Sequence, residues 1–221
     1  TGLMVSLFEG SDPAEAGGAD LTARQILERG EAKVERELGD APEVQARLLR
    51  VLGEVHHALG NLPRARTLLD RAAALERSLH PEPDPALADT LASLADLAHD
   101  EGKLEEALAL ARQVLELRRT VFGERSVEAA TALGAVGLEL GTQARYEESE
   151  ALLREATAIL RVAGGPDDPD LAFYLNILGQ TVYRRGDRAG SIPMFQEALA
   201  VQRRVLGDVH PDTAGTLNNL A

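Results

Sequence analysis

Apolar residues recur at helical spacing along most of the chain, in pairs of stretches separated by a short break. The residues from Ala46 to Leu59 place a leucine or valine at every third or fourth position. The stretch from Leu62 to Leu79 does the same after a break at Gly60-Asn61. This period is that of an amphipathic helix that buries one face. The pattern therefore predicts a helix, a tight turn and a second helix, which together form one structural unit.

This unit recurs four times at an offset of forty-two residues, and no gap is needed between copies. The recurring positions are mostly small, and small residues are needed where two helices cross closely. They are Gly53, Gly60, Ala65, Leu69 and Ala72; Ala95, Gly102, Ala107, Ala111 and Val114; Gly137, Ala144, Ser149, Leu153 and Ala156; and Gly179, Gly186, Ser191, Phe195 and Ala198. One unit cannot bury its own apolar face, so neighbouring units must stack. The predicted fold class is therefore all-α, with the chain forming a solenoid.

The spacing within the unit resembles the tetratricopeptide repeat, which has Leu-Gly in its first helix and Ala-x3-Phe-x2-Ala in its second. Phe195 is the only aromatic residue at the large position, which Leu69, Ala111 and Leu153 occupy in the other copies. The period of forty-two exceeds the usual thirty-four and lies in the range of HEAT and armadillo units, which remain the alternative. The internal spacing favours the tetratricopeptide repeat, with the extra residues placed after the second helix. The resemblance implies a right-handed superhelical solenoid of helix-turn-helix repeats.

The last residues resemble the forty-two-residue variant of this repeat that is found in kinesin light chains. The resemblance rests on Val205-Leu-Gly-Asp-Val-His-Pro-Asp-Thr-Ala214, which continues into Leu217-Asn-Asn-Leu-Ala221. The asparagines of that run commonly face a bound peptide in the family. The resemblance therefore implies that Asn218 and Asn219 contact a partner.

The repeat length also predicts how the chain is divided. We expect a divergent helical hairpin with a long turn over 1–45, repeats over 46–85, 86–127, 128–169 and 170–211, and the first helix of a fifth repeat over 212–221. In the hairpin, a helix is expected from Leu21 to about Leu38, with Asp20 or Thr22 as its N-cap, and its partner over Leu3 to Glu9. Because the chain begins at Thr1 and stops within a helix instead of a capping unit, we expect a piece of a longer protein.

Three stretches near the start resemble a more specific group of proteins. They are Leu7-Phe-Glu-Gly-Ser-Asp-Pro-Ala-Glu-Ala16, Leu21-Thr-Ala-Arg-Gln-Ile-Leu-Glu-Arg-Gly30 and Pro42-Glu-Val-Gln-Ala-Arg-Leu-Leu49. They resemble the region that opens the C-terminal repeat array of bacterial serine/threonine protein kinases of the eukaryotic type. The resemblance implies a docking or sensing arm of a signalling kinase. Similar arrays also follow transcription-factor and nucleotide-switch modules, which remain alternatives.

No motif in the chain indicates catalysis. The glycine-rich loop, His-Arg-Asp and Asp-Phe-Gly motifs of kinases are missing, as is a phosphate-binding loop. There is no cysteine for thiolate chemistry or disulfides, so the redox compartment stays open. We expect a binding protein that is not an enzyme and uses no cofactor.

Charge and hydropathy narrow the classes of partner that the chain is expected to bind. Asp and Glu number 36 against 23 Lys and Arg, and the net charge is −13, which disfavours nucleic acid and anionic membrane. The apolar run from Leu3 to Phe8 is too short to span a bilayer and lacks the basic flank of a signal peptide. We expect no direct membrane contact. A cytoplasmic location is favoured, and an extracytoplasmic one would follow if a membrane segment precedes Thr1.

In such solenoids the first helices line a concave groove, and one stripe of each helix points into it. We therefore expect a peptide or helix of a partner protein to lie along this stripe, with amides bonding its backbone and aromatic rings anchoring a side chain. The predicted contact residues are Arg50, Glu54, His57, Asp96, His99, Leu138, Phe173, Asn176, Gln180, Tyr183, Asn218 and Asn219. The alternatives are that these residues are only solvated, that the asparagines bond between neighbouring helices, or that the array is a spacer or self-association module.

Two more specific sites are disfavoured by the same residues. Glu54 with His57, and Asp96 with His99, are acid–histidine pairs three residues apart, as in di-metal helical bundles. The later repeats lack such pairs, so we predict no metal. A clamp for a C-terminal carboxylate would need a lysine and an asparagine in one repeat, an asparagine in the next, and a lysine and an arginine in the third. At these places the chain has Arg50 and Glu54, then Ser93, then Thr131 and Ala135.

Overall fold

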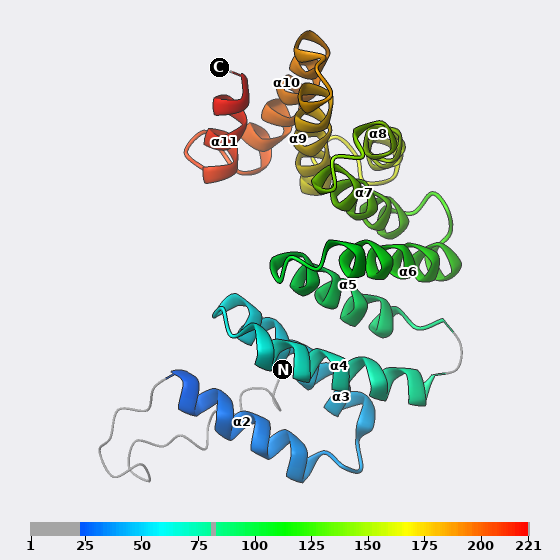
Figure 1. The fold of residues 1–221 in the computed structure, drawn as a ribbon, viewed down its shortest axis with the longest axis vertical. Helices are drawn as coiled ribbons and strands as arrows, with labels where there is room; N and C mark the ends of the chain where they lie inside the picture. The colour runs from blue at the N-terminus through cyan, green and yellow to red at the C-terminus, as the bar shows by residue number, and fades with distance from the viewer. Residues whose placement is uncertain (1–22, 81–82, 221) are drawn as a thin grey trace. The chain divides into compact units, whose positions relative to one another are not determined.

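The computed structural model describes residues 23–80 and 83–220, and every regular element in these ranges is an α-helix (Figure 1). The helices are α2 (Ala23–Glu37), α3 (Pro42–Ala58), α4 (Leu62–Leu79), α5 (Pro85–Asp100), α6 (Leu104–Phe122), α7 (Val127–Thr142), α8 (Tyr146–Ala163), α9 (Pro169–Arg184), α10 (Arg188–Val205) and α11 (Pro211–Leu220). The predicted all-α repeat architecture is confirmed. The expected helix over Leu3 to Glu9 and the N-caps Asp20 and Thr22 lie outside the described residues.

The chain forms two compact units, Thr1–Leu97 and Ala98–Ala221, and the division falls within α5. Unit 1 contains α2, α3, α4 and most of α5. Unit 2 contains the end of α5 and the helices from α6 to α11.

The first helices begin before the first residues of the predicted repeats, whose boundaries stay a prediction. The helix α3 begins at Pro42, four residues before the predicted Ala46, because proline suits the first turn, where its missing N–H leaves no bond unmade. Later first helices likewise begin one residue before the predicted repeat boundary, with Pro85, Val127, Pro169 and Pro211 as their first residues. The bounds of α4, Leu62 to Leu79, are as predicted.

One recurring residue closes the turn after each first helix in a left-handed conformation. Gly60 and Gly102 both have φ of 75°, and Gly186 has φ of 107°. The third copy has Ala144 there, with φ of 59°, and it is the only non-glycine residue with positive φ among those described. An alanine in this region is strained because its Cβ crowds the backbone.

The recurring small residues lie where they were predicted to lie, at the crossing of the two helices of a unit. A Cβ placed on Gly53 would be 2.7 Å from Cγ of Leu69, and one on Gly137 would be 2.8 Å from Cγ of Leu153. Such distances leave no room for a side chain. The small position of the first helix therefore faces the large position of the second.

In unit 1, a buried polar network joins α2 to the helix pair α3 and α4. Nε2 of His56 lies 2.7 Å from Oε1 of Glu31, and the guanidinium of Arg64 binds the other oxygen of the same carboxylate, with Nε at 2.8 Å. Asn61 lies 3.2 Å from the second ring nitrogen of His56. Glu31 and His56 are both buried, so their pairing offsets the cost of removing them from water.

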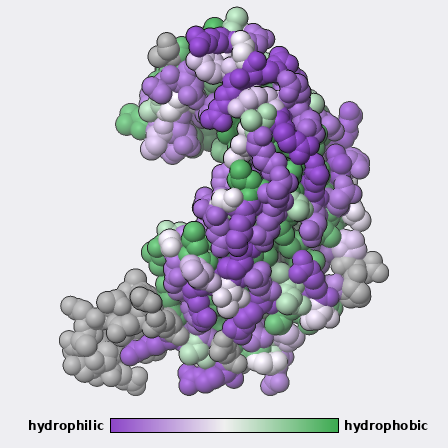
Figure 2. All heavy atoms as spheres, in the orientation of Figure 1, coloured by the Kyte–Doolittle hydropathy of each residue, from purple (hydrophilic) through white to green (hydrophobic). Residues whose placement is uncertain are grey.

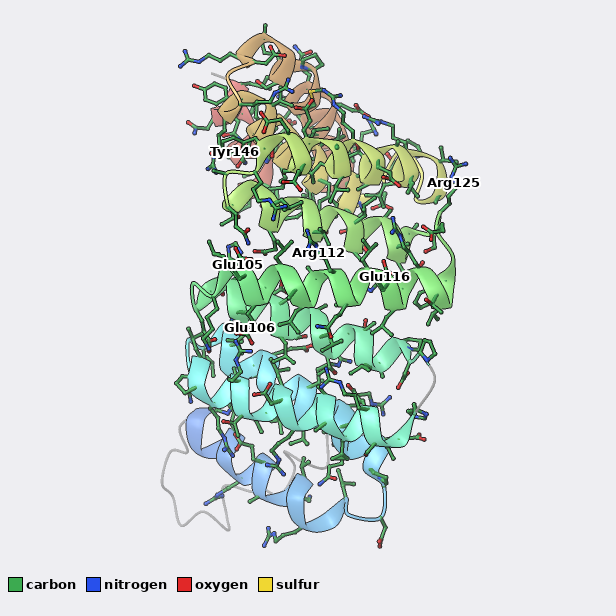
Figure 3. The ribbon with its side chains drawn as sticks, turned by 45° about the vertical axis from the view of Figure 1, so that its right-hand side comes forward. Glu105, Glu106, Arg112, Glu116, Arg125 and Tyr146 are labelled. Carbon is green, nitrogen blue, oxygen red and sulfur yellow. The ribbon has the colours of Figure 1, made fainter. Side chains whose placement is uncertain are left out.

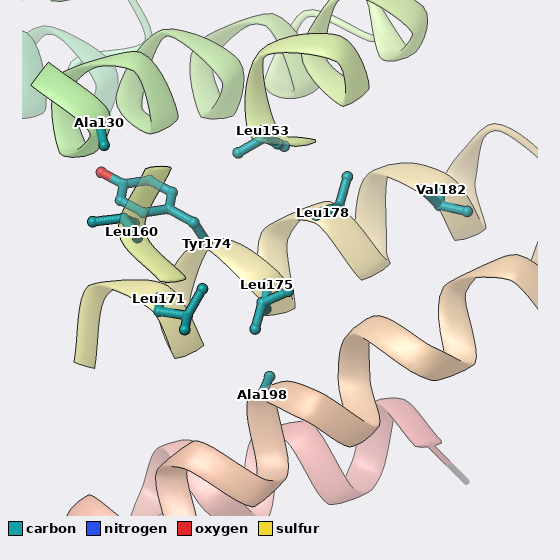
Figure 4. Packing of buried hydrophobic residues seen from close by; sticks show 9 residues of the cluster. All are labelled: Ala130, Leu153, Leu160, Leu171, Tyr174, Leu175, Leu178, Val182 and Ala198. Carbon is teal, nitrogen blue, oxygen red and sulfur yellow. The ribbon is translucent and has the colours of Figure 1, made fainter. Parts of the chain in front are cut away.

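In unit 2, leucines from α8 and α9 form the core around Tyr174 (Figure 4). The Tyr174 hydroxyl donates a 2.7 Å hydrogen bond to the carbonyl of Thr131, and its ring covers Gly134 on α7. Phe173 meets the Tyr174 ring edge-on, with centroids 5.0 Å apart. This packing fixes the start of α9, which carries several of the predicted contact residues.

The outward sides of the second helices are polar. On α6 the exposed residues Glu105, Glu106, Arg112 and Glu116 lie in water, and the acidic pair opens the helix, where it complements the positive end of the dipole (Figure 3). Hydrophilic residues dominate the face drawn in Figure 2. Arg118-Arg119, Arg184-Arg185 and Arg203-Arg204 lie near the C-terminal ends of α6, α9 and α10, where cations suit the negative end of the helix dipole.

Candidate functional site

Three hollows in unit 2 meet at one residue, Gln180 of α9. The first, of about 540 Å³, lies between α9, α10 and α11; the second, of about 580 Å³, lies beside Tyr183; and the third, of about 180 Å³, lies against α7. Gln180 lines all three. Its side-chain amide has no hydrogen-bond partner among the described residues, so it can bond a ligand that crosses from one hollow to the next.

The eight predicted contact residues of unit 2 all line one or more of these hollows. They are His99, Leu138, Phe173, Asn176, Gln180, Tyr183, Asn218 and Asn219. The helical period brings the α9 members to one face, and α11 brings the two asparagines beside them. That these residues contact a partner stays a prediction.

The first hollow has a mixed apolar and amide wall. Phe173 is 50% exposed, and Val201 and Val205 of α10, with Leu206 directly after it, complete the apolar part. Gln202 also lines it and is only 4% exposed, and its Oε1 has no hydrogen-bond partner in the described residues. The hollow therefore offers an apolar surface together with an unmatched acceptor.

Asn176 and Asn219 also bond to each other between neighbouring helices, which is one of the alternatives given for the asparagines from the sequence. Asn219 Nδ2 donates to Asn176 Oδ1 at 2.9 Å, and Asn176 Nδ2 donates to the Thr216 hydroxyl at 3.1 Å. These bonds join α9 to α11 across the mouth of the hollow. Asn218 has no such bond among the described residues and is exposed.

The second hollow is flanked by an aromatic ring and a cation. The Arg188 guanidinium lies 5.2 Å from the ring centroid of Tyr183, within cation–π range. Tyr183 is 45% exposed, and Ile192 lies nearby on the same hollow. A side chain that stacks on Tyr183 would find one ring face and an apolar floor.

The third hollow carries a histidine that is already bonded. Nδ1 of His99 lies 2.9 and 3.1 Å from the two oxygens of the buried Glu139. Leu138, Gly141 and Tyr146 form the surrounding wall. His99 thus pairs with a carboxylate of α7, an interaction that the acid–histidine pattern on α5 did not predict.

The four predicted contact residues of unit 1 are less concentrated. Glu54 Oε1 accepts hydrogen bonds of 2.8 Å from both Arg50 and Ser93, so this carboxylate ties α3 to α5. Arg50 lines a recess with other charged groups. Nowhere in residues 23–80 or 83–220 do three or more His, Asp or Glu side chains gather in a way that could hold a metal ion.

Sequence reasoning missed the part of the site that second helices supply. Arg188, Ile192, Val201, Gln202, Val205 and Leu206 all line the first or second hollow. Gln202 could have been noticed, because it is polar at a repeat position where the preceding copy has the core leucine Leu160.

A match to a family profile identifies the family of the chain. The tetratricopeptide repeat profile matches three overlapping windows, residues 44–120, 86–161 and 128–200. The chain belongs to the tetratricopeptide repeat family. Repeats of this family mediate protein–protein interactions, and arrays of them bind protein partners.

Solved structures share the fold at low sequence identity. BtubC (BKLC) from P. vanneervenii superposes with a TM-score of 0.74 at 23% identity, covering 90% of this chain and 82% of its own. A kinesin-light-chain candidate from Podosopora anserina with nearly identical TPR-like repeats gives 0.67 at 17% identity, covering 81% of this chain and 84% of its own. A substituted form of that protein gives 0.69 at the same identity and coverage. The array therefore resembles kinesin-light-chain-like repeats in fold.

Two further observations are negative. No protein with a curated description matches the sequence significantly. Among the described helices, none is both long and apolar enough to cross a bilayer.

Proposed function

We propose that this tetratricopeptide array is a protein-interaction scaffold, and that unit 2 binds an extended or helical segment of a partner along α9 and α11. The observation that carries the proposal is the convergence of three hollows on Gln180, whose amide has no partner among the described residues. An amide side chain can bond both the N–H and the C=O of a peptide backbone.

The size of the groove sets the length of the ligand. Phe173 and Tyr183 are ten residues apart on α9, which corresponds to about 15 Å along the helix axis. An extended peptide covers that distance with about five residues. The two rings would anchor side chains at its ends and Gln180 would hold its middle, with an affinity of about micromolar, or about 8 kcal/mol.

The experiment is to select short peptides from a random display library on the wild-type protein and to titrate them calorimetrically. The double variant Gln180→Ala/Tyr183→Ala should keep its helicity and bind the selected peptides at least tenfold more weakly. A matched control is Gln113→Ala/Val162→Ala, which removes an amide and an exposed apolar side chain in unit 2 away from the hollows. Equal binding by both doubles would refute the groove assignment.

The biological setting that we propose is the regulatory or docking arm of a bacterial signalling serine/threonine kinase. Its support is the resemblance of the stretches at Leu7, Leu21 and Pro42 to the start of the repeat array in those kinases. Translating the reading frame upstream of Thr1 tests it. A kinase domain there would support the proposal, whereas a DNA-binding or nucleotide-switch module would replace the kinase and leave the scaffold function in place.

A further inference from the structure

Unit 1 contains a recess of about 430 Å³ with an unusual wall. It lies where the start of α3, the end of α4 and the start of α5 come together. Its lining residues are Glu43, Val44, Arg47, Arg50, Glu76, Leu79, His80, Asp84, Ala86 and Asp89. Four carboxylates and two arginines therefore share one small space.

The same recess occurs a second time in the chain, three repeat lengths later, as the first hollow of unit 2. Eight of its ten lining residues have counterparts at an offset of 126 residues that also line that hollow. The pairs are Glu43 and Pro169, Arg47 and Phe173, Arg50 and Asn176, Glu76 and Gln202, Leu79 and Val205, His80 and Leu206, Ala86 and Asp212, and Asp89 and Gly215. The recess is thus a feature of the repeat, and only its chemistry differs between the two copies.

The difference in chemistry between the two recesses is clearest at the position of Glu76 and Gln202. Glu76 is 3% exposed and Gln202 is 4% exposed, and each has a side-chain oxygen without a hydrogen-bond partner among the described residues. In the two repeats between them this position is occupied differently. Arg118 donates to the Thr131 hydroxyl at 3.1 Å, and Leu160 is wholly buried in the core. The first and fourth repeats therefore each combine a recess with a buried side-chain oxygen that has no hydrogen-bond partner among the described residues.

The carboxylate of Glu76 is only half satisfied within the protein. Oε1 accepts a 3.0 Å hydrogen bond from the Thr90 hydroxyl, whereas Oε2 has no partner among the described residues. Burial raises the pKa of Glu76, and the bond from Thr90 and the charge of Arg50 offset only part of that effect. Arg50 is itself held by Glu54 through a 2.8 Å bond.

A buried carboxylate oxygen without a partner is costly unless a donor, and best a cation, pairs with it. The four acids of the wall, Glu76 included, outnumber its two arginines, Arg47 and Arg50, so the wall has a net negative charge. Leu79 and Val44 offer apolar surface to an aliphatic stem. Lysine and arginine combine these properties, since their apolar stems pack while their charged heads seek acceptors.

We infer that the recess at Glu76 receives a lysine or arginine side chain of a bound partner chain, and that the equivalent recess at Gln202 receives a neutral one. The recess at Glu76 is separate from the groove proposed for unit 2 and does not depend on it. The recess at Gln202 is the first hollow of that groove, so this half of the inference rests on the proposed function. The repeated recess would thus select a basic side chain in repeat 1 and, separately, an uncharged one in repeat 4.

The test uses the whole chain and three small probes, N-acetyl-lysinamide, N-acetyl-argininamide and the uncharged isostere N-acetyl-norleucinamide. Amide chemical shifts are followed by NMR during titration at low salt. We expect the two cationic probes, and not the norleucine probe, to shift residues around Glu76 and Thr90. The effect should weaken at least fivefold in Glu76→Gln, the residue that repeat 4 carries naturally.

The reciprocal variant makes the test independent of how well Glu76→Gln folds. Gln202→Glu should create a lysine-dependent shift at the end of α10 that the wild type lacks. The groove variant Gln180→Ala/Tyr183→Ala should leave the response at Glu76 unchanged. Equal shifts with the norleucine probe, or cationic binding that survives Glu76→Gln while Gln202→Glu gains none, would overturn the inference.

Discussion

Gly179 lies directly beneath the ring of Phe195, and a Cβ added to it would be 2.6 Å from Cε1 of that ring. The pair joins α9 to α10 and is the fourth-repeat version of the contacts between Gly53 and Leu69 and between Gly137 and Leu153. In the second repeat the sequence has alanine at both positions, Ala95 and Ala111. Where the position on the first helix has alanine instead of glycine, the facing position on the second helix has a smaller side chain than leucine or phenylalanine.

This relationship predicts coupled substitutions. Gly179→Ala should lower the free energy of unfolding by about 1–3 kcal/mol, because the aromatic ring must shift to admit the methyl group. The double variant Gly179→Ala/Phe195→Leu should be less destabilised than the sum of the two single variants. Urea unfolding of the four proteins gives the coupling energy, and strict additivity would show that the two residues do not share this space.

The strained turn at Ala144 predicts a stabilising substitution. Ala144→Gly should raise the free energy of unfolding by about 1 kcal/mol, because glycine adopts the left-handed conformation without the Cβ penalty. Gly102→Ala is the matched control, since it introduces the same strain at the equivalent position and should destabilise. Thermal unfolding of the two variants checks this, and a lower Tm for Ala144→Gly would contradict it.

The network around Glu31 predicts a local loss of stability. Glu31→Ala leaves the buried His56 ring without its carboxylate partner and should cost about 3–5 kcal/mol in unit 1. Hydrogen exchange should then accelerate in α2, α3 and α4. Arg154→Ala, which breaks an ion pair on the partly exposed side of α8, should cost about 1 kcal/mol or less. Unchanged protection of α2 in Glu31→Ala would show that the network does not hold that helix.

The free energy of unfolding should depend on pH through the buried carboxyl group of Glu76. Because burial raises its pKa in the folded state, its contribution to stability is fully present below its unfolded pKa and is lost as pH rises through the folded one. Glu76→Gln keeps an acceptor for Thr90 and removes this loss. The Tm of the variant relative to wild type should therefore rise between about pH 4 and pH 7.

Glu197 serves as a control, because its effect on stability should change with pH in the opposite direction. Its bidentate pair with Arg161, with bonds of 2.7 and 2.8 Å, lowers the pKa of Glu197, so its contribution is present at neutral pH and is lost as pH falls through that lowered value. Glu197→Gln should lose a few tenths of a kcal/mol at pH 7, since the pair is partly exposed, and nothing at low pH. Parallel pH profiles for the Glu76 and Glu197 variants would contradict both assignments.

The sequence predicted the helices and their crossings well because both depend on local spacing. The bounds of α4 and the contact of Gly53 with Leu69 follow directly from a period that one chain displays several times. The start of α3 at Pro42 was missed, because the apolar period begins later than the proline that opens the helix.

The candidate site was predicted in part. Phe173, Gln180 and Tyr183 of the predicted stripe line the hollows of unit 2, and their contact with a partner stays a prediction. It could not supply Gln202, which reaches the hollow from the end of a second helix, at a place that α11 encloses. Nor could it supply the pair of Glu31 with His56, because spacing along the chain does not determine which polar side chains of α2 and α3 meet.

The most direct measurement is a hydrogen-exchange footprint of the wild-type protein with and without a display-selected peptide. Binding in the groove predicts that protection increases in α9 and α11 around Gln180 and Asn218, and that this change disappears in Gln180→Ala/Tyr183→Ala. Protection confined to the outward faces of α6 and α8, with α9 and α11 unchanged, would contradict the proposed groove.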